Sequence, residues 1–413
     1  MIENGLLVII ESKDSIEINE NTEEMMLLCQ SAKVKITETI VFKRNFIDPD
    51  FYIGKGQAFS LADISLESSV DVIIFSENLS PNQLRNLEET TKNKVIDRTQ
   101  LILDIFAQRA KSNEGKIQVE LAQLKYLLPR LTGQGKSMSR IGSGSGVATR
   151  GPGETKLETD RRRIKDRIQK LNIKLENIVK HRKISNNKRY ISWTPSVSLI
   201  GYTSAGKSTL LSKLSGEDFY SDKMLFSTLD SVSRKVQISS NHNIFLSDTV
   251  GFLRNLPHNI INAFKSTLED INEADILIHV IDATKDNPQE YIKVVNEVLN
   301  ELEIIDKPII LAFNKSDLCD RQRLQELYYM YPECCFISAK YGTGLETLHE
   351  KILSIIKENF VSIKIILPYS NNKISLLYEY GNLTEKEYLD TGIYIEGSIP
   401  KELYYYFQDY QVK

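Results

Sequence analysis

The chain has 413 residues, too long for one ordinary domain, so two to four domains are expected. Hydrophobic residues make up 41% and charged residues 26%, which is typical of a globular protein and excludes an intrinsically disordered chain. The formal charge of −3 is close to neutral and hides an uneven distribution. Four cysteines without metal-binding spacing favour a reducing cytoplasmic location. No apolar run approaches the ~20 residues of a membrane span, so neither membrane insertion nor a signal peptide is expected.

Residues 1–115 are predicted to form a small α/β domain. The runs "LLVIIE" at 6–11, "TETIVFK" at 37–43 and "DVIIFSE" at 71–77 are typical of strands. Helices are predicted over 23–32 and 80–92, the second with Ser80 as its N-cap and Pro81 in its first turn. The segment "FYIGKGQAF" at 51–59 contains two glycines but an incomplete dinucleotide fingerprint. A tight turn is therefore favoured there over a second nucleotide site.

Two heptad patterns flank a loop within residues 116–190. Their apolar positions step by four and three residues, which predicts an antiparallel helical hairpin, with Pro129 ending or kinking the first helix. The positions are Ile117, Leu121, Leu124, Leu128 and Leu131 before the loop, and Ile164, Ile168, Leu171, Leu175 and Ile178 after it.

The connecting loop, "GQGKSMSRIGSGSGVATRGPGETK" at 133–156, is rich in glycine and basic residues. From residue 130 to 189 there are 17 Lys and Arg against 5 Asp and Glu, so a local charge of +12 is concentrated here. Such a concentration favours a polyanion, and RNA rather than DNA or a membrane surface. The alternative is a disordered basic linker. Candidate RNA-binding residues are Arg140, Arg150, Gly151, Arg161, Arg162 and Arg163.

The segment "GYTSAGKS" at 201–208 matches the phosphate-binding pattern G-x-x-x-x-G-K-[ST]. It follows the strand-like run "SVSLI" and precedes a helical pattern that Gly216 is expected to cap. Glycines allow the backbone N–H groups to face phosphate oxygens, and the start of the following helix adds partial positive charge. Lys207 is expected to reach the β and γ phosphates, and Ser208 to bind Mg²⁺.

Three further motifs end apolar strands within residues 195–360 and indicate a P-loop GTPase domain. Asp248 and Gly251 in "DTVG" are suited to Mg²⁺ and the γ-phosphate. In "NKSD" at 314–317, the Asp317 carboxylate accepts from the two donors that guanine has and adenine lacks. "SAK" at 338–340 is expected to support the base from its other side. GTP or GDP with Mg²⁺ is therefore the expected cofactor set.

The segment "MLFSTLDSVSR" at 224–234 is expected to supply a threonine to Mg²⁺, and Thr228 is chosen over Ser227, Ser231 and Ser233. Lys207, Thr228 and Gly251 are the catalytic candidates, and Ser208, Thr228 and Asp248 the metal ligands. The full set of nucleotide-contact candidates is Gly201, Tyr202, Thr203, Ser204, Ala205, Gly206, Lys207, Ser208, Thr209, Phe226, Ser227, Thr228, Leu229, Asp230, Asp248, Thr249, Val250, Gly251, Asn314, Lys315, Ser316, Asp317, Ser338, Ala339 and Lys340.

Phe252 occupies the position after the DTVG glycine, where many GTPases place a glutamine that orients water. A phenyl ring cannot orient or deprotonate water. Slow intrinsic hydrolysis that a partner stimulates is therefore expected.

Residues 361–413 are predicted to form a small α+β domain. Nine of the 19 tyrosines fall here, and we expect them to pack its core rather than to stack on RNA bases. The positions are Tyr369, Tyr378, Tyr380, Tyr388, Tyr394, Tyr404, Tyr405, Tyr406 and Tyr410.

Over nearly its whole length the chain resembles the HflX family of ribosome-associated GTPases. The resemblance rests on "RGPGETKLETDRR" at 150–162, "GYTSAGKSTL" at 201–210, "FSTLD" at 226–230, "DTVGF" at 248–252 and "NKSD" at 314–317, with support from 95–110 and 119–131. Two positions differ: family members usually have asparagine at the position of Ser204, which is linked to potassium coordination in related GTPases, and proline at that of Ser231.

The resemblance implies a GTPase that binds the large ribosomal subunit and its rRNA, is stimulated by it, and splits or rescues stalled or idle ribosomes under stress. The sequence itself gives no sign of an oligomer, so a monomer is expected. It also implies that the hairpin loop reaches towards the peptidyl transferase centre. Two alternatives remain. One is a nucleotide-gated ribosome-binding factor for subunit storage or assembly, with incidental hydrolysis. The other is an ATP-driven RNA remodeller that uses the first domain.

Overall fold

The structure is a computed structural model that describes residues 3–11, 15–43, 46–131, 152–190, 194–217, 225–226, 228–239, 242–254, 257, 260, 268–371 and 373–412. Its contacts group into two compact units. The first unit comprises residues 1–180 together with 222–230 and 253–267. The second comprises 181–221, 231–252 and 268–413. Two short segments from the middle of the GTPase motifs therefore group with the N-terminal part of the chain, which the linear domain boundaries did not anticipate.

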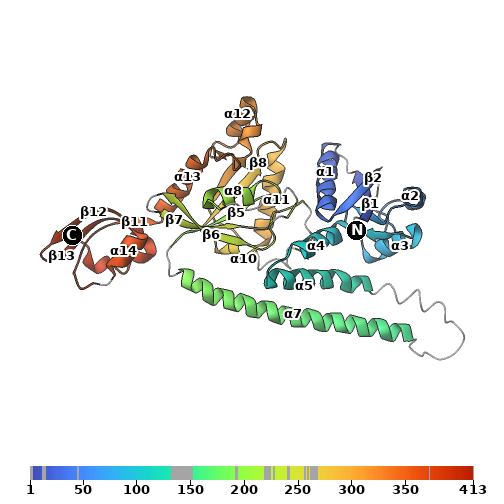
Figure 1. Ribbon diagram of the computed structural model, residues 1–413, viewed down its shortest axis with the longest axis horizontal. Coiled ribbons are helices and arrows are strands. Elements are labelled where there is room, and N and C mark those ends of the chain that lie inside the picture. The colour runs from blue at the N-terminus through green and yellow to red at the C-terminus, as the bar shows by residue number, and fades with distance from the viewer. Residues whose placement is uncertain are drawn as a thin grey trace. The chain divides into compact units, whose positions relative to one another are not determined.

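The first unit contains a four-stranded parallel sheet in the order β2-β1-β3-β4. Its strands β1 and β2 are labelled in Figure 1. Its elements are β1 (Glu3–Glu11), α1 (Ser15–Ser31), β2 (Val34–Lys43), α2 (Lys55–Glu67), β3 (Val72–Phe75), α3 (Pro81–Thr91) and β4 (Lys94–Ile96). The apolar centres of β1 and β3 are fully buried, as expected for strands of a parallel sheet covered on both faces. The predicted strands and helices of this region are confirmed, including Ser80 as N-cap and Pro81 in the first turn of α3.

Helix α4 (Arg98–Arg109) begins at Asp97, which is completely buried and connects three elements. Its carboxylate accepts hydrogen bonds from the Leu79 backbone at 3.2 Å, from the Tyr126 hydroxyl at 2.8 Å and from the Arg130 guanidinium at 3.0 Å. Arg130 was counted in the basic region of the sequence, yet it pairs with this carboxylate. The buried pair fixes the end of the next helix, directly before the glycine-rich loop, to the N-terminal domain.

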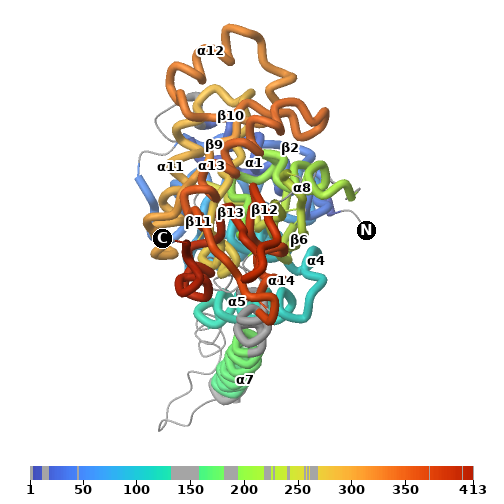
Figure 2. The backbone as a smooth tube through the Cα atoms, turned by 90° about the vertical axis from the view of Figure 1, so that its left-hand side faces the viewer, coloured from blue at the N-terminus to red at the C-terminus, as the bar shows by residue number. Residues whose placement is uncertain are grey.

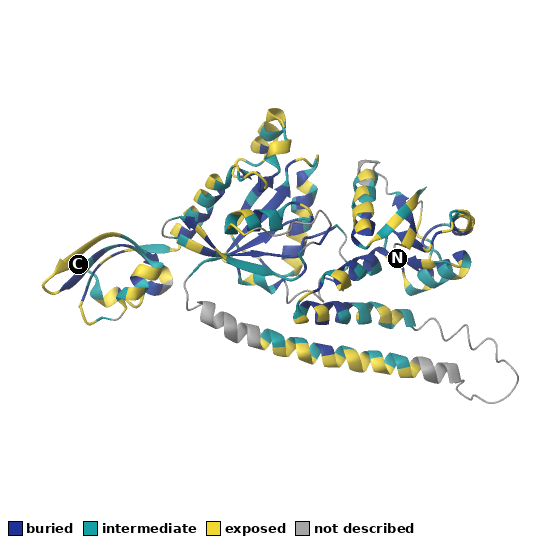
Figure 3. Ribbon diagram, in the orientation of Figure 1, coloured by how far each residue is buried: buried dark blue, intermediate teal, exposed yellow. Residues whose placement is uncertain are grey.

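Helices α5 (Asn113–Arg130) and α7 (Pro152–Tyr190) form the predicted hairpin (Figures 1 and 3). A shared apolar seam joins them, and a bidentate ion pair between Arg167 and Glu120 lies beside it, with distances of 2.7 and 2.9 Å. The seam consists of Ile117, Leu121, Leu124, Ile168, Leu171, Leu175 and Ile178, seven of the ten heptad positions. Pro129 lies in the last turn of α5, as expected. Residues 132–151, which include Arg140, Arg150 and Gly151, lie outside the described residues.

The second unit is built on a six-stranded sheet in the order β10-β9-β8-β5-β7-β6, in which only the β6–β7 pair is antiparallel. Its strands are β5 (Ser196–Ile200), β6 (Val232–Ser239), β7 (His242–Asp248), β8 (Ile276–Asp282), β9 (Ile309–Asn314) and β10 (Cys335–Phe336). Its helices are α8 (Lys207–Ser215), α10 (Glu269–Glu273), α11 (Pro288–Glu301), η2 (Ser316–Leu318), α12 (Arg321–Met330) and α13 (Leu345–Glu358). This is the mostly parallel P-loop architecture that the motifs predicted.

The C-terminal part of the second unit is an antiparallel sheet, β11-β13-β12, whose strands lie side by side in Figure 2. Its elements are β11 (Phe360–Leu367), α14 (Ile374–Tyr380), β12 (Asn382–Leu389), β13 (Gly392–Pro400), α15 (Lys401–Tyr404) and η3 (Gln408–Tyr410). The expectation of a tyrosine core is wrong for the fully buried positions, and only Tyr380, Tyr404 and Tyr410 pack half-buried against them. The buried core consists of Ile363, Ile365, Leu367, Leu377, Ile393, Ile395, Ile399, Leu403 and Phe407. Tyr369, Tyr378, Tyr388, Tyr405 and Tyr406 are exposed.

All four cysteines are free thiols, and Cys334 and Cys335 are buried in and beside β10, as expected for core residues. Burial raises the pKa of the Cys334 thiol to about 11, so it stays protonated. Among the described helices, none combines the length and the hydropathy that crossing a membrane requires.

Candidate nucleotide-binding site

The phosphate-binding segment connects β5 to α8 at the carboxyl end of the central sheet. Gly206 is the N-cap of α8 and has φ +98°, a backbone conformation that L side chains rarely adopt. A Cβ atom there would also collide with the Asn314 side-chain amide. Helix α8 ends at Gly216 with φ +69°, which confirms the predicted cap. The loop geometry therefore requires glycine where the pattern has it.

Lys207 is nearly buried, and its ammonium donates to the backbone oxygens of Gly201 at 3.0 Å and Tyr202 at 2.9 Å. Burial lowers its pKa to about 8, and the charge of Asp248 counteracts this only in part. In the part of the chain that the structure describes, this desolvated ammonium is therefore held by backbone oxygens, and the Asp248 carboxylate acts on it through its charge. An anionic phosphate would stabilise its charged form.

Ser208, in the first turn of α8, contacts Asp248 at the carboxyl end of β7. The Ser208 hydroxyl donates to Asp248 Oδ2 at 2.7 Å, and Asp248 is buried at the end of β7. Thr249 fixes the next turn, since its hydroxyl donates to the Leu199 backbone oxygen at 2.7 Å. Two oxygen ligands of the kind that Mg²⁺ prefers are therefore held together beside the phosphate-binding segment.

Asn314 connects the phosphate-binding segment to the SAK segment. Its amide donates to the Ala205 backbone oxygen at 2.7 Å, and its side-chain oxygen accepts from the Ala339 backbone at 2.9 Å. Asn314 is 3% exposed, so it acts as a structural link rather than as an open contact for the base. Direct contact of Asn314 and Ala339 with a nucleotide stays a prediction. Their hydrogen bonds hold the phosphate-binding segment and the SAK segment next to each other.

The residues around the expected base site divide into paired and open groups. Lys315 forms an ion pair with Asp282 at 2.6 Å, at the end of β8. Asp317 and Lys340 are exposed, so both can reach a ligand. The sequence analysis did not identify Asp282 as a residue of this site. Its position as an acidic residue at the end of a buried strand could have indicated it.

Phe252 is 2% exposed and belongs to the protein interior. Its backbone pairs with the phosphate-binding segment: its N–H donates to the Gly201 oxygen at 3.1 Å, and its oxygen accepts from the Thr203 N–H at 2.9 Å. The side chain is therefore committed to packing, and its backbone positions the segment that holds Gly251.

The remaining nucleotide-contact candidates fall into three groups. The first group lies on the same loops and helix starts as the residues described above: Tyr202, Thr203, Ser204, Thr209, Val250, Ser316 and Ser338. Ser204 has φ +61°, a conformation that asparagine adopts more readily than serine. Phe226, Thr228, Leu229 and Asp230 group with the first unit, and Ser227 lies outside the described residues. None of these nucleotide contacts is tested by the structure, and each stays a prediction.

Three of the predicted RNA-binding arginines lie on α7. Arg162 and Arg163 are exposed, whereas Arg161 is half-buried and its Nε is enclosed without a hydrogen-bond partner among the described residues. Arg162 and Arg163 are therefore the described residues best placed to contact a polyanion.

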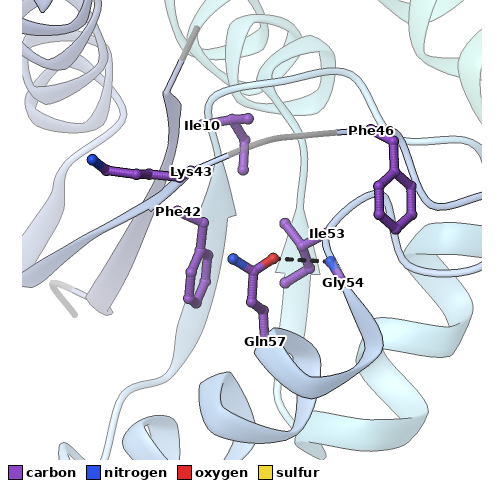
Figure 4. A pocket seen from close by; sticks show the side chains of 7 residues that line it. All are labelled: Ile10, Phe42, Lys43, Phe46, Ile53, Gly54 and Gln57. Atoms are coloured by element: carbon purple, nitrogen blue, oxygen red, sulfur yellow. Dashed lines mark hydrogen bonds between the residues drawn. The ribbon is translucent and has the colours of Figure 1, made fainter. Parts of the chain in front are cut away.

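A pocket of about 180 Å³ lies in the N-terminal domain, at the carboxyl ends of β1 and β2 (Figure 4). Its lining is mostly apolar and includes Ile10, Phe42 and Phe46, with Lys43 as its basic group. The Gly54 N–H donates to Gln57 Oε1 at 2.9 Å, and Gly54 has an ordinary φ of −61°. Gly54 is therefore the N-cap of α2 and Gly56 lies in its first turn, so this segment begins a helix instead of forming the tight turn that was favoured.

His279 is a buried strand residue beside the phosphate-binding segment. Burial, and to a smaller extent the Lys207 charge, lowers its pKa to about 3. The unfolded chain protonates this imidazole near its ordinary value of ~6.5, so stability is lost as the pH falls below that value. Between pH 6.5 and 5 this residue is expected to remove about 2 kcal/mol of unfolding free energy.

A His279→Leu variant should lose this acid dependence. Urea unfolding followed by the fluorescence of Trp193, the only tryptophan, at pH 7.5 and pH 5.0 measures it. Equal acid dependence in the wild type and the variant would contradict the buried neutral imidazole.

Three family models match successive regions of the chain. Residues 19–107 match the N-terminal region of GTP-binding GTPases, residues 109–189 match their middle region, and residues 196–315 match a model described as a 50S ribosome-binding GTPase. The GTPase HflX of Caldanaerobacter subterraneus subsp. tengcongensis is 42% identical over 97% of this chain and 92% of its own length. The chain belongs to the HflX family of GTPases. GTP hydrolysis is therefore its activity class, and a guanine nucleotide its ligand.

Other HflX proteins are also similar along most of their length. GTPase HflX of Escherichia coli K12 is 38% identical over 90% of this chain and 87% of its own length. Among solved structures, a GTP-binding protein from Sulfolobus solfataricus in complex with GDP is 29% identical, covers 85% of this chain and 98% of its own, and has a TM-score of 0.44.

Proposed function

We propose that this HflX-family chain binds the large ribosomal subunit and uses GTP binding and hydrolysis to dissociate or rescue stalled or idle ribosomes in the cytoplasm. The main support for this proposal is that one chain combines the complete set of GTPase motifs with a hairpin whose second helix is strongly basic. The matching description of a 50S ribosome-binding GTPase supports the ribosomal partner.

The nucleotide role rests on the geometry around α8. Lys207 and the loop amides would hold phosphate, and Asp317 would bind guanine. Ser208, Thr228 and Asp248 would hold Mg²⁺, and the 2.7 Å contact between Ser208 and Asp248 shows that two of these oxygen ligands already face each other. When bound, Mg²⁺ neutralises charge that develops on the phosphates.

The rRNA role rests on the hairpin. Its apolar seam uses one face of α7, and the rest of the helix surface carries many exposed cationic residues. Exposed side chains on that helix include Arg162, Arg163, Lys165, Lys170 and Lys174. A helix with an excess of exposed cations suits a phosphate backbone, and its binding should weaken with salt.

Stimulation by the subunit follows from Phe252. This position carries a buried phenyl ring where many GTPases have the glutamine that orients water. GTP turnover should therefore rise at least tenfold when purified large subunits are added. Turnover that is equally fast without subunits would contradict the proposal.

The same assay tests the hairpin. Arg162→Ala and Arg163→Ala should each weaken subunit binding by about three- to tenfold at physiological salt, and deletion of residues 133–150 should weaken it more. Lys293→Ala on α11 removes an exposed cation outside the hairpin and is the matched control. Unchanged subunit affinity in all three hairpin variants would remove the rRNA contact from the proposal.

The buried Phe252 also favours a second candidate, a nucleotide-gated binding factor whose hydrolysis is incidental. A non-hydrolysable GTP analogue separates the two functions. If intact ribosomes dissociate with the analogue and the protein then remains bound, hydrolysis serves release and the first function holds. If ribosomes stay intact and only free subunits are bound, the storage or assembly role is the better description.

A further inference from the structure

Asp230 follows Thr228 by two residues, and its carboxylate lies at the N-terminus of helix α5. The backbone N–H groups of Lys111 and Ser112 donate to Asp230 Oδ2 at 3.0 and 2.8 Å, and the Ser112 hydroxyl donates to Asp230 Oδ1. All of these residues belong to the first unit. The positive end of a helix dipole and three donors thus hold one carboxylate.

Gly115 makes this contact possible. It lies in the first turn of α5, and its N–H donates to the Ser112 hydroxyl at 2.8 Å. A Cβ atom at this position would collide with Asp230 Oδ1. Glycine within a helix is ordinarily unfavourable, so close approach of the carboxylate is the visible reason for it here.

The residues before Thr228 are also attached to the N-terminal domain. The Leu225 N–H donates to the Ser31 hydroxyl at 3.0 Å, and the Phe226 ring meets the Phe106 ring edge-on at 4.6 Å between centroids. Leu225 and Phe226 are buried. The segment that carries Thr228 is therefore held on both sides, by apolar contacts before it and by Asp230 after it.

We propose that Asp230 is a positioning residue that couples the nucleotide-dependent movement of Thr228 to helix α5 and hence to the basic hairpin. The inference rests on the proposed Mg²⁺ role of Thr228. Two residues span at most ~7 Å of extended chain, so Thr228 can move only a short way while Asp230 stays on α5. When Thr228 engages Mg²⁺ and the γ-phosphate, Asp230 leaves the start of α5.

Helix α5 is the element that can pass this change to the hairpin. Ile117 lies about half a helical turn after Gly115, and Leu121 lies nearly two turns after it. Both belong to the seam that packs on α7. The far end of α5 is fixed by the pair between Arg130 and Asp97. When Asp230 leaves, the N-terminal end of α5 therefore loses a hydrogen-bond partner, while its C-terminal end stays attached through Arg130.

Hydrogen exchange of the full-length protein tests the coupling without ribosomes. With a non-hydrolysable GTP analogue and Mg²⁺, the Lys111 and Ser112 amides should exchange at least tenfold faster than with GDP. In Gly115→Ala, which displaces Asp230 while adding a better helix former, exchange should be fast in both states. Gly56→Ala in the first turn of α2 is the matched control, because its Cβ meets nothing within 4 Å.

The outcomes are separable from those of the ribosomal proposal. Equal exchange at Lys111 and Ser112 in the two nucleotide states would overturn the coupling, provided that exchange in residues 201–208 shows the nucleotide bound. Asp230→Ala should reproduce the Gly115→Ala result, and wild-type exchange in both variants would also overturn the coupling.

A second experiment adds large subunits. Gly115→Ala should reduce the ratio of subunit affinities between the GTP-analogue and GDP states at least threefold. Subunits that bind in neither state would reject the ribosomal function and leave the exchange result standing.

Discussion

Replacing Asp317 with asparagine is expected to lower the affinity for GTP about 100-fold and to raise that for xanthosine triphosphate. Asp317 is exposed at the start of the segment after β9, and its neighbour Lys315 is fixed by the ion pair with Asp282 at 2.6 Å. A carboxylate accepts from both guanine donors, and loss of charged hydrogen bonds costs about 1.5–3 kcal/mol each. Asparagine has one donor and one acceptor, which suits xanthine.

Competition binding with both triphosphates measures this change. Asp320→Asn is the matched control: Asp320 caps α12 three residues further on, and asparagine caps helices equally well. The control should retain the GTP preference of the wild type. If Asp317→Asn also retains it, guanine is recognised elsewhere and the assignment of the NKSD motif fails.

Replacing Lys207 with alanine should lower the single-turnover rate of GTP hydrolysis by a factor of roughly 100 to 1,000. Removal of one donor that stabilises transition-state charge typically has an effect of this size. Lys207 is desolvated, with a pKa lowered to about 8, so phosphate binding stabilises its charged form where water cannot. Hydrolysis at saturating GTP and the affinities for GTP and GDP should be measured together.

Lys213→Ala on the same helix is the control, because Lys213 is exposed at the far end of α8. It should leave both the rate and the affinities unchanged. A normal hydrolysis rate in Lys207→Ala, under conditions where Lys213→Ala is also normal, would remove Lys207 from the catalytic set.

The fold of the GTPase region was predictable because its signals are local. Each motif combines a buried strand with a polar turn at its end, and the carboxyl ends of parallel strands meet at one edge of the sheet. The order of motifs along the chain therefore brings Gly206, Ser208, Asp248 and Asn314 together in the structure. The hairpin was predictable for a similar reason, since two heptad patterns separated by one loop pair with each other.

The tyrosine-rich C-terminal region was mispredicted because composition does not reveal which face of a strand is covered. Isoleucine alternates through β11 and β13, and these residues fill the core. Tyrosine tolerates exposure because its hydroxyl stays hydrated, so its abundance carries little information about burial. The roles of Phe252 and Asn314 were equally out of reach, since each depends on which distant backbone the residue meets.

By itself, the sequence determined the P-loop class, the guanine-selective motif and the concentration of positive charge on a helical hairpin, because each follows from short-range pattern and residue chemistry. Tertiary structure alone decided that Asp230 lies on helix α5 and that Arg130 pairs with Asp97. These contacts join residues 118 and 33 positions apart, and their formation depends on the packing of whole elements rather than on any local preference.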